Sequence, residues 1–474
     1  MRSEWRAVGA LCGVVVLGGA GCSVGSAEGG PERDRGAGVG EEAELRSPSA
    51  ACASGAAGCG RTLAESRAGG TSEACGREPF GRQFAADNAT LRGFAVSDDS
   101  NSVLAGAFEG TLTFGATSLT SAGGTDVFVA KLDACGVPLW SARFGDAEAQ
   151  AALDVAADDK GALVLGEFTG AVDFGTVRLT ASPPGGPELF VANLKASGRT
   201  RWAAQIAADE DSILLGKAIA SDGRGGALVL GTLEGAARVA GHRIERRAIG
   251  TFVVRLDRSG RFSWVSLPPS GSDTGEIGIE VDDDDNIFIA SADGRGNATF
   301  LTKLDEDGAL LWHKRFPGSP EQAEDLYDFA VDPDGSVLLA GTGVFGEEEL
   351  PGGPSPFVAK IDPDGNVLWV TRFDGVQTAR EIAASDDAVF LAGDSLCTPD
   401  ESPSCSAWAA ELSPDGQVRW TERLGQGAVV SGLEVDARDN PMLAGSFQGT
   451  VEVGDDVLTS EENALFVGRL LASD

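Results

Sequence analysis

Residues 128–145 read Phe128-Val-Ala-Lys-Leu-Asp-Ala-Cys-Gly-Val-Pro-Leu-Trp140-Ser-Ala-Arg-Phe-Gly145. Apolar residues alternate before an Asp-x-x-Gly segment, and a second stretch after that segment carries the tryptophan. Alternation on both sides of a short turn that contains glycine is typical of a β-hairpin. The stretch therefore predicts two antiparallel strands joined by a tight turn.

This pattern recurs along the chain, and successive tryptophans of the same slot lie 62, 62, 48, 57 and 51 positions apart. A second strand pair precedes each copy, so each unit predicts four strands, named A to D below. A repeat of this length is typical of propeller blades. Because the tryptophans share one register, we expect them to pack in the core rather than to stack on sugars. The seven copies begin at Phe128, Phe190, Phe252, Phe300, Phe357, Trp408 and Phe466.

The last unit ends after strand C, and its strand D is expected at the other end of the chain. There, Cys75-Gly-Arg-Glu-Pro-Phe80 aligns with Cys135-Gly-Val-Pro-Leu-Trp140. Pairing of the two ends would leave no open sheet edge. The sequence therefore predicts an all-β fold over residues 76–474. It is a seven-bladed β-propeller of four-stranded antiparallel blades, its ring closed by an N-terminal strand that completes the last blade.

The repeat resembles the bacterial seven-bladed β-propeller repeat family (SBBP repeats). The resemblance rests on Asp126-Val-Phe-Val-Ala-Lys-Leu-Asp133 with Gly136 and Trp140, and on Val331-Asp-Pro-Asp-Gly-Ser-Val-Leu-Leu-Ala-Gly341. It covers nearly all of residues 76–474 and implies a secreted or surface-exposed propeller, often in lipoproteins. It transfers no catalytic residues, because the family shares none.

The N-terminus predicts export. An apolar stretch over residues 8–17 is too short to span a bilayer, so residues 1–21 are expected to be a signal peptide. Leu17-Gly-Gly-Ala-Gly-Cys22 resembles a bacterial lipoprotein signal, whose cleavage would leave Cys22 for lipidation. Gly19 departs from that pattern, so ordinary signal-peptidase cleavage stays open. The expected location is the outer membrane or cell surface, with the periplasm or secretion as alternatives.

Residues 22–75 are rich in Gly, Ala, Ser, Glu and Arg and have few large apolar side chains. Such a segment cannot bury enough surface to offset its ordering entropy, so we expect a flexible tether. The whole chain carries 72 acidic and 37 basic residues, a net charge of −35. That field repels nucleic acid and anionic lipid. We expect a monomer that meets a protein or glycan at the cell envelope and touches the membrane only through a lipid anchor.

The sequence offers no catalytic constellation. His242 and His313 are the only histidines and lie in different units, so a histidine-based zinc site or a catalytic histidine is not favoured. Acidic turns could supply oxygen ligands to calcium, yet none has the spacing of a full calcium loop, and Asp, Pro and Gly are also what tight turns require. We therefore expect no catalytic residue and no cofactor, with calcium as an alternative. The weak calcium candidates are Asp282, Asp284, Asp332, Asp334, Asp362 and Asp364.

Cysteine spacing in an exported chain predicts disulfides. Cys397 and Cys405 bracket a short loop, and Cys75 and Cys135 occupy the same slot on either side of the seam between the chain ends. Cys52 and Cys59 could close a small loop in the tether.

Two further patterns bear on function. Units one, two, three and seven carry an extra Gly-centred segment between strands B and C, which predicts four small hairpins on one face, a candidate docking surface. Strand A positions are mostly Ala, Gly and aliphatic, with charged exceptions at Asp154, Lys217, Asp328 and Glu381. We expect a non-catalytic cell-surface scaffold that binds a protein or other ligand. The alternatives are a propeller enzyme (lyase, hydrolase or quinone-dependent dehydrogenase), which would need inward charges around the axis, and a carbohydrate- or calcium-binding module.

Overall fold

The computed structural model describes residues 78–473, with gaps at 159, 183–185, 270–273, 294–297, 319–324, 344, 346–354, 374–377 and 395–405. The chain divides into two units, Met1–Ser66 and Arg67–Asp474, and every described residue belongs to the second. The expected signal peptide and tether lie outside the described residues, as do Cys22, Cys52, Cys59, Cys75, Cys397 and Cys405. The described part consists of strands and connections, and it holds no helix of membrane-spanning length and hydropathy.

Two regions show the repeating unit as a separate four-stranded antiparallel sheet whose strands pair in sequence order. The first contains β16 (Thr274–Val281), β17 (Ile287–Asp293), β18 (Ala298–Leu304) and β19 (Leu310–Pro317). The second contains β20 (Asp325–Val331), β21 (Val337–Gly343), β22 (Ser355–Ile361) and β23 (Val367–Arg372). This is the A-to-D order that the sequence predicts.

Elsewhere neighbouring units share strands. β1 (Phe80–Val96) pairs through its first half with β29 (Asp456–Arg469) and through its second half with β2 (Ser102–Phe114). β27 (Val418–Val435) is likewise strand D of one unit and strand A of the next, so several units merge into an 11-stranded sheet. The other strands of this sheet are β3 (Thr117–Thr120), β4 (Asp126–Leu132), β5 (Pro138–Phe144), β24 (Glu381–Ala384), β25 (Val389–Asp394), β26 (Ser406–Leu412) and β28 (Pro441–Val453).

Units two and three also join, into an 8-stranded sheet, but here strand B of unit three extends to pair with strand D of unit two; a two-stranded hairpin is separate. The sheet contains β6 (Gln150–Asp158), β7 (Gly161–Phe168), β10 (Glu188–Lys195), β11 (Thr200–Ala208), β12 (Ile213–Ser221), β13 (Ala227–Val239), β14 (His242–Leu256) and β15 (Phe262–Ser266). The hairpin contains β8 (Ala171–Asp173) and β9 (Arg178–Thr180).

A glycine near the end of strand B repeats because a carbonyl of strand A and a large ring of strand C both lie against it; a Cβ on Gly106 would lie 2.0 Å from the carbonyl oxygen of Thr90. Phe128 lies directly across from Gly106 and is fully buried, and a Cβ on Gly106 would lie 2.8 Å from that ring. Gly445 and Phe466 repeat the arrangement in the last unit. Burying each such ring contributes about 1.5–3 kcal/mol. The glycine that ends Leu-Ala-Gly in strand B and the first Phe of strand C therefore pack together as a pair.

The predicted extra hairpins are present in units one, two, three and seven. Each begins at a glycine with positive φ, such as Gly110 (81°) and Gly170 (70°). In two of them a carboxylate of the preceding D–A connection holds the base: Asp87 accepts the N–H of Thr111 at 2.7 Å, and Asp146 accepts that of Ala171 at 2.9 Å. The hairpins are therefore fixed to the scaffold at their bases.

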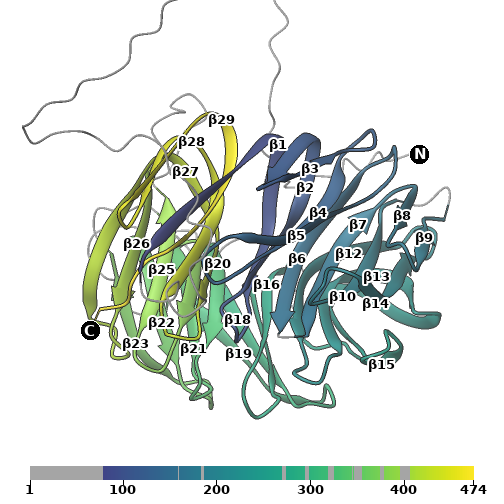
Figure 1. The fold of residues 1–474 in the computed structure, drawn as a ribbon. Helices are drawn as coiled ribbons and strands as arrows, with labels where there is room; N and C mark the ends of the chain where they lie inside the picture. The colour runs from purple at the N-terminus through teal and green to yellow at the C-terminus, as the bar shows by residue number, and fades with distance from the viewer. Residues whose placement is uncertain are drawn as a thin grey trace, which may run out of the picture. The chain divides into compact units, whose positions relative to one another are not determined.

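Figure 1 shows the sheets standing side by side, with their innermost strands turned toward a common axis. Buried aliphatic and aromatic side chains form clusters between neighbouring units; one such cluster joins β1, β2 and β4 to β28 and β29. Antiparallel sheets packed face to face around a central channel define a β-propeller.

Candidate functional site

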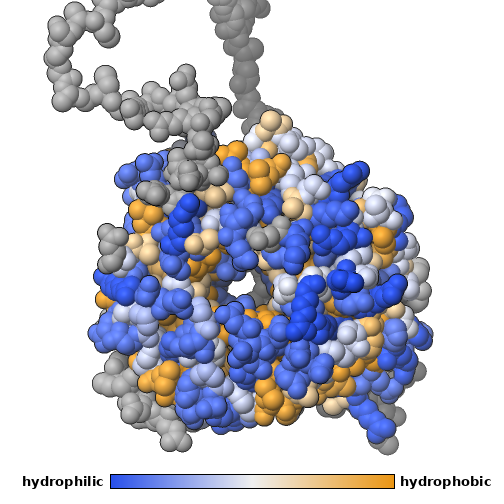
Figure 2. All heavy atoms as spheres, turned by 60° about the horizontal axis from the view of Figure 1, so that its bottom comes forward, coloured by the Kyte–Doolittle hydropathy of each residue, from blue (hydrophilic) through white to orange (hydrophobic). Residues whose placement is uncertain are grey.

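The seven innermost strands, β1, β6, β12, β16, β20, β24 and β27, line one cavity of about 600 Å³. Figure 2 shows its opening on the face of the A–B and C–D turns, surrounded mainly by hydrophilic residues. We call this cavity the channel.

A recurring β-bulge decides which side chains line the channel. In six of the seven strands one residue is skipped in the pairing of strand A with strand B. A bulge shifts the alternation of side chains along a strand. Side chains that follow the bulge therefore point to the face opposite to the one they would occupy in a regular strand. The skipped residues are Arg92, Leu153, Lys217, Ile277, Tyr327 and Ser431, and all of them line the channel.

Five carboxylates and two cationic side chains belong to the channel wall, so the wall carries a net charge of −3 (two minus five) when all are ionised. Arg92 and Lys217 lie four residues before the ends of their strands and are the first residues of those strands to line the channel, on the side of the hairpins. Glu280 and Glu434 lie one residue from the ends of their strands, on the side of the A–B turns. The other acidic members are Asp154, Asp328 and Glu381.

Two of the five carboxylates join neighbouring units. Asp154 accepts the N–H of Ile219 in the next unit at 2.8 Å, and Asp328 accepts that of Ile382 at 2.9 Å. Their positions match one another in units two and five. A hydrogen bond of this kind to a charged acceptor contributes about 1.5–3 kcal/mol, so these two aspartates have a structural role.

The other three carboxylates, Glu280, Glu381 and Glu434, have neither a hydrogen bond nor an ion pair with any residue that the structure describes. Solvent in the channel reaches all three: Glu280 is exposed there, and Glu381 and Glu434 are half-buried. They are therefore unpartnered acidic groups on the wall of the channel.

The surroundings of the five channel carboxyl groups change their pKa values. Burial, and then the charges of Asp328 and Asp154, raise the pKa of Glu280 to about 8. Burial also raises the pKa of Asp154 and of Asp328 to about 7, although backbone N–H groups act in the opposite direction. The pKa of Glu381 and that of Glu434 lie well above the ordinary value, again from burial first and from neighbouring carboxylates second. At neutral pH the channel therefore retains protons that separate carboxyl groups in water would have lost.

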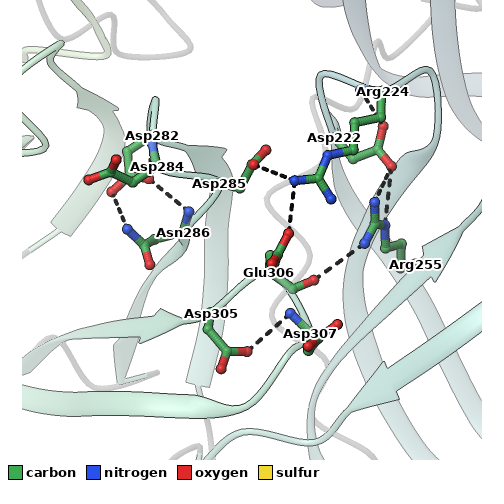
Figure 3. Close-up of polar contacts among 10 residues, drawn as sticks. All are labelled: Asp222, Arg224, Arg255, Asp282, Asp284, Asp285, Asn286, Asp305, Glu306 and Asp307. Atoms are coloured by element: carbon green, nitrogen blue, oxygen red, sulfur yellow. Dashed lines mark hydrogen bonds and ion pairs between the residues drawn. The ribbon is translucent and has the colours of Figure 1, made fainter.

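The weak calcium candidates are engaged in their own turns. Asp282 accepts the N–H of Asn286 at 2.7 Å and that of Asp284 at 3.1 Å (Figure 3). Asp362 caps the C–D turn of the next unit in the same way, accepting from the N–H groups of Asn366 and Asp364. Asp332 accepts from Ser336, as does Asp334, and pairs with Lys360 at 2.6 Å. Within the described ranges no group of three or more His, Cys, Asp or Glu side chains is arranged to hold a metal ion.

Ion pairs extend this network between units. Arg224 in the A–B turn of unit three reaches Asp285 at 2.6 Å and Glu306 at 2.8 Å in unit four (Figure 3). Arg255 pairs with Asp222 within its own unit at 2.8 Å. These turn carboxylates thus have partners, unlike Glu280, Glu381 and Glu434 on the channel wall.

The strand D tryptophans lie between units, as their common register predicts. In four units the indole N–H donates to a backbone carbonyl in the C–D turn of the following unit, so these rings help to join neighbouring units. The pairs are Trp140–Ala196 at 2.8 Å, Trp202–Arg258 at 3.0 Å, Trp312–Pro363 at 3.2 Å and Trp369–Pro414 at 3.1 Å.

Neither histidine lies at the channel. His242 stacks on Phe262 with 4.6 Å between ring centroids, and His313 stacks on Phe300 and contacts Thr302 at 2.9 Å. Cys135 is disulfide-bonded, and its partner lies outside the described residues, so the pairing with Cys75 stays a prediction.

Sequence reasoning identified four channel residues, Asp154, Lys217, Asp328 and Glu381, as charged exceptions in strand A. It missed Arg92, Glu280 and Glu434. A signal for the two glutamates was present: they stand directly after the large apolar residue of strand A, where most units have Ala.

No family model and no curated protein sequence matches the chain. Among solved structures, the WD40 domain of Neurospora crassa Pan2 is similar at 12% identity, over 83% of this chain and 97% of that one, with a TM-score of 0.42. A structure of YCF48 bound to D1 peptide is similar at 12% identity over 82% and 96% of the two chains, also at a TM-score of 0.42. A puromycin hydrolase is similar at 14% identity over 77% and 59%, with a TM-score of 0.34. These distant likenesses say nothing of a ligand or an activity.

Proposed function

We propose that the chain is an exported, non-catalytic β-propeller of the SBBP type whose channel binds a positively charged ligand. The observation that carries the proposal is the set of unpartnered carboxylates, Glu280, Glu381 and Glu434, around one cavity. Keeping such groups together costs stability, because burial and mutual repulsion oppose their ionisation. A cation in the channel would offset both terms, so binding is the use of this arrangement that its energetics favour.

The architecture belongs to the same proposal. We infer seven blades in a closed ring, with residues 80–85 of β1 as the fourth strand of the last blade. Seven inner strands on one cavity and the pairing of Phe80 with Arg469 support this inference. The Cys75–Cys135 disulfide would lock the seam, and non-reducing peptide mapping tests it: the two cysteines should appear in one linked peptide, and linkage of Cys135 to another cysteine would contradict it.

The cellular location of the protein is a further part of the proposal. Cleavage before Cys22 and lipidation there would place the propeller on the outer membrane, at the end of a tether formed by residues 23–75. Metabolic labelling with a fatty-acid analogue in a bacterial host tests this. The full chain should incorporate label and Cys22→Ser should not; equal labelling of both would contradict it.

Binding itself is tested by titration calorimetry of residues 76–474, or of the full chain, at pH 8.5 and low salt. Calcium chloride and a small aliphatic amine serve as the cationic probes, and sodium acetate serves as the anionic control. We expect heat of binding with a cationic probe and none with acetate. The triple variant E280Q/E381Q/E434Q should lose the cationic signal, whereas Glu210→Gln, an exposed charge outside the channel, should keep it.

A catalytic role is the second candidate, and it has one observation in its favour. Asp154 and Asp328, with pKa values near 7, lie in the same wall as Lys217. Carboxyl groups with pKa values near the working pH suit general acid–base catalysis. Both aspartates, however, accept backbone N–H groups of the next unit, so their carboxylates are already engaged. Chemical conversion of a bound cationic probe, followed by mass spectrometry, would move the assignment from binding module to enzyme.

A further inference from the structure

The acidic groups of the channel are spread around the ring and along the axis. Glu280 is on β16, which β20 separates from β24; Glu381 is on β24, and Glu434 is on the adjoining strand β27. Glu381 lies three residues before the end of its strand, whereas Glu280 and Glu434 each lie one residue before the end of theirs. A single small ion therefore cannot touch most of them at once, in agreement with the lack of a metal-holding group of three within the described ranges.

Many of the side chains between these charges are small. The lining includes alanines and aliphatic residues such as Ala156, Ala220, Ala330 and Ala383, which bring no hydrogen-bonding side chains. A volume of about 600 Å³ lies within the size range of sites for small organic molecules. The channel thus places separated negative charges among small side chains, and the complementary molecule is narrow and carries separated positive charges.

Resting on the proposed function, we propose that the channel binds a linear aliphatic oligoamine and releases protons as the oligoamine enters. Each ammonium group would pair with a carboxylate that has no protein partner, and the methylene segments would lie against the alanines. Protons held by the empty channel would leave to bulk water, because a carboxyl group must ionise to pair with an ammonium group. No covalent bond forms or breaks.

The geometry also gives a direction of entry. Arg92 and Lys217 stand on the hairpin side and repel an approaching cation, whereas Glu280 and Glu434 stand on the side of the A–B turns. An oligoamine therefore enters through the opening seen in Figure 2 and meets the two cations at the far end.

The charged and titratable groups that face the ligand come from all seven inner strands, and all of them enter the pH dependence. They are Arg92 on β1, Asp154 on β6, Lys217 on β12, Glu280 on β16, Tyr327 and Asp328 on β20, Glu381 on β24, and Glu434 on β27. Arg380, next to Glu381, acts in the opposite sense to the carboxylates and favours ionisation of Glu381.

The test compares spermine, butylamine and calcium chloride by titration calorimetry with the full chain, at pH 6.0 and pH 8.5. We expect spermine to bind at least about tenfold more tightly than butylamine or calcium, a difference of about 1.4 kcal/mol. We also expect about a tenfold loss of spermine affinity at pH 6.0. Repeating the titration in two buffers of different ionisation enthalpy counts the protons released, and more than zero should leave per spermine at pH 7.

Two variants with opposite charge changes make the test specific. E280Q/E434Q should weaken spermine binding by about tenfold, whereas Lys217→Gln should strengthen it by about threefold, because it removes a repelling charge in the low-dielectric channel. Lys217 is exposed to the channel and has no hydrogen bond or ion pair with the described residues, so folding should tolerate its loss. Glu210→Gln is the control and should change nothing.

The outcomes separate the two levels of inference. If no cationic probe binds at pH 8.5, the proposed function itself is wrong. If calcium or butylamine binds as tightly as spermine, or if spermine affinity is equal at both pH values with no proton released, the oligoamine inference is wrong while a cation-binding channel stands. If Lys217→Gln weakens spermine binding, the ligand does not reach this channel in the way described.

Discussion

The acidic residues of the A–B and C–D turns and those of the channel are the same residue types in opposite circumstances. In the turns, Asp362 accepts backbone and side-chain hydrogen bonds from Asn366, and its pKa is lowered as a result. In the channel, Glu280 has no such donor, and burial raises its pKa to about 8. A carboxylate with donors stabilises the fold, whereas one without donors costs stability. The difference separates structural acids from those available to a ligand.

The largest effect on stability should come from breaking a buried ion pair that includes a turn carboxylate. Arg469 and Asp436 lie 2.9 Å apart with both side chains fully buried. Arg469→Met leaves Asp436 buried and unpaired, so we expect a loss of about 3–5 kcal/mol in the free energy of unfolding. Urea unfolding followed by fluorescence measures it.

A second arginine beside the same aromatic ring, that of Phe80, provides a matched control variant. Arg82, like Arg469, has its guanidinium near Phe80, at 5.3 Å against 5.0 Å, but its partner Asp456 is 3.6 Å away and both side chains are exposed. Arg82→Met should cost less than about 1 kcal/mol. Equal losses for the two variants would show that the cation near the ring, and not the buried pair, carries the energy.

Removing charge from the channel should raise the free energy of unfolding instead of lowering it. A carboxyl group whose pKa is raised in the folded state binds its proton more tightly there than in the unfolded chain. Stability therefore falls as pH rises from the ordinary pKa through the folded one, from about 4.5 to about 8 for Glu280. E280Q/E434Q lacks this loss, so it should be more stable than the parent at pH 8.5 and nearly equal at pH 4.5.

We expect a gain of about 1–2 kcal/mol at pH 8.5, which is smaller than the pKa change alone implies because water in the channel screens these groups. Thermal unfolding at the two pH values measures it, with Glu210→Gln beside it. A double variant that is less stable at pH 8.5 would mean that the two glutamates have a partner in the fold.

The smallest effect concerns the tryptophans between units. Trp312 donates its indole N–H to Pro363, whereas the indole nitrogen of Trp264 is buried without an acceptor within the described residues. Trp312→Phe should cost about 1 kcal/mol beyond the cost of Trp264→Phe, because only the first removes a hydrogen bond. Differential scanning calorimetry of both variants decides the point, and equal shifts would refute it.

Much of the fold follows from the sequence, because each unit repeats the same local sequence pattern. Alternating apolar residues, Asp-x-x-Gly turns and a tryptophan at one register predict the hairpins, and the extra Gly-centred segments predict four more. The merging of sheets could not be seen, since it depends on whether strand D continues into strand A without a break, as in β1 and β27.

The channel was predicted less well for a physical reason. A charged residue in strand A lines the axis or packs between units according to the phase of the strand, and a bulge at Ile277 or Ser431 changes that phase. Glu280 and Glu434 follow those bulges. Their lack of hydrogen-bond donors is a property of seven strands together, and no single unit reveals it.

The pairing of β1 with β29 has a consequence for how the chain folds. Gly81 and Asp456, whose groups bond at 2.9 Å, are separated by 375 residues. During synthesis residues 80–85 emerge first and have no partner until almost the whole chain has been made, so one β-edge stays open for longer than any other. Loop closure over such a separation is slow. Docking of these two segments should therefore be the last and slowest kinetic phase of refolding, and the phase most open to capture by another chain or by a chaperone.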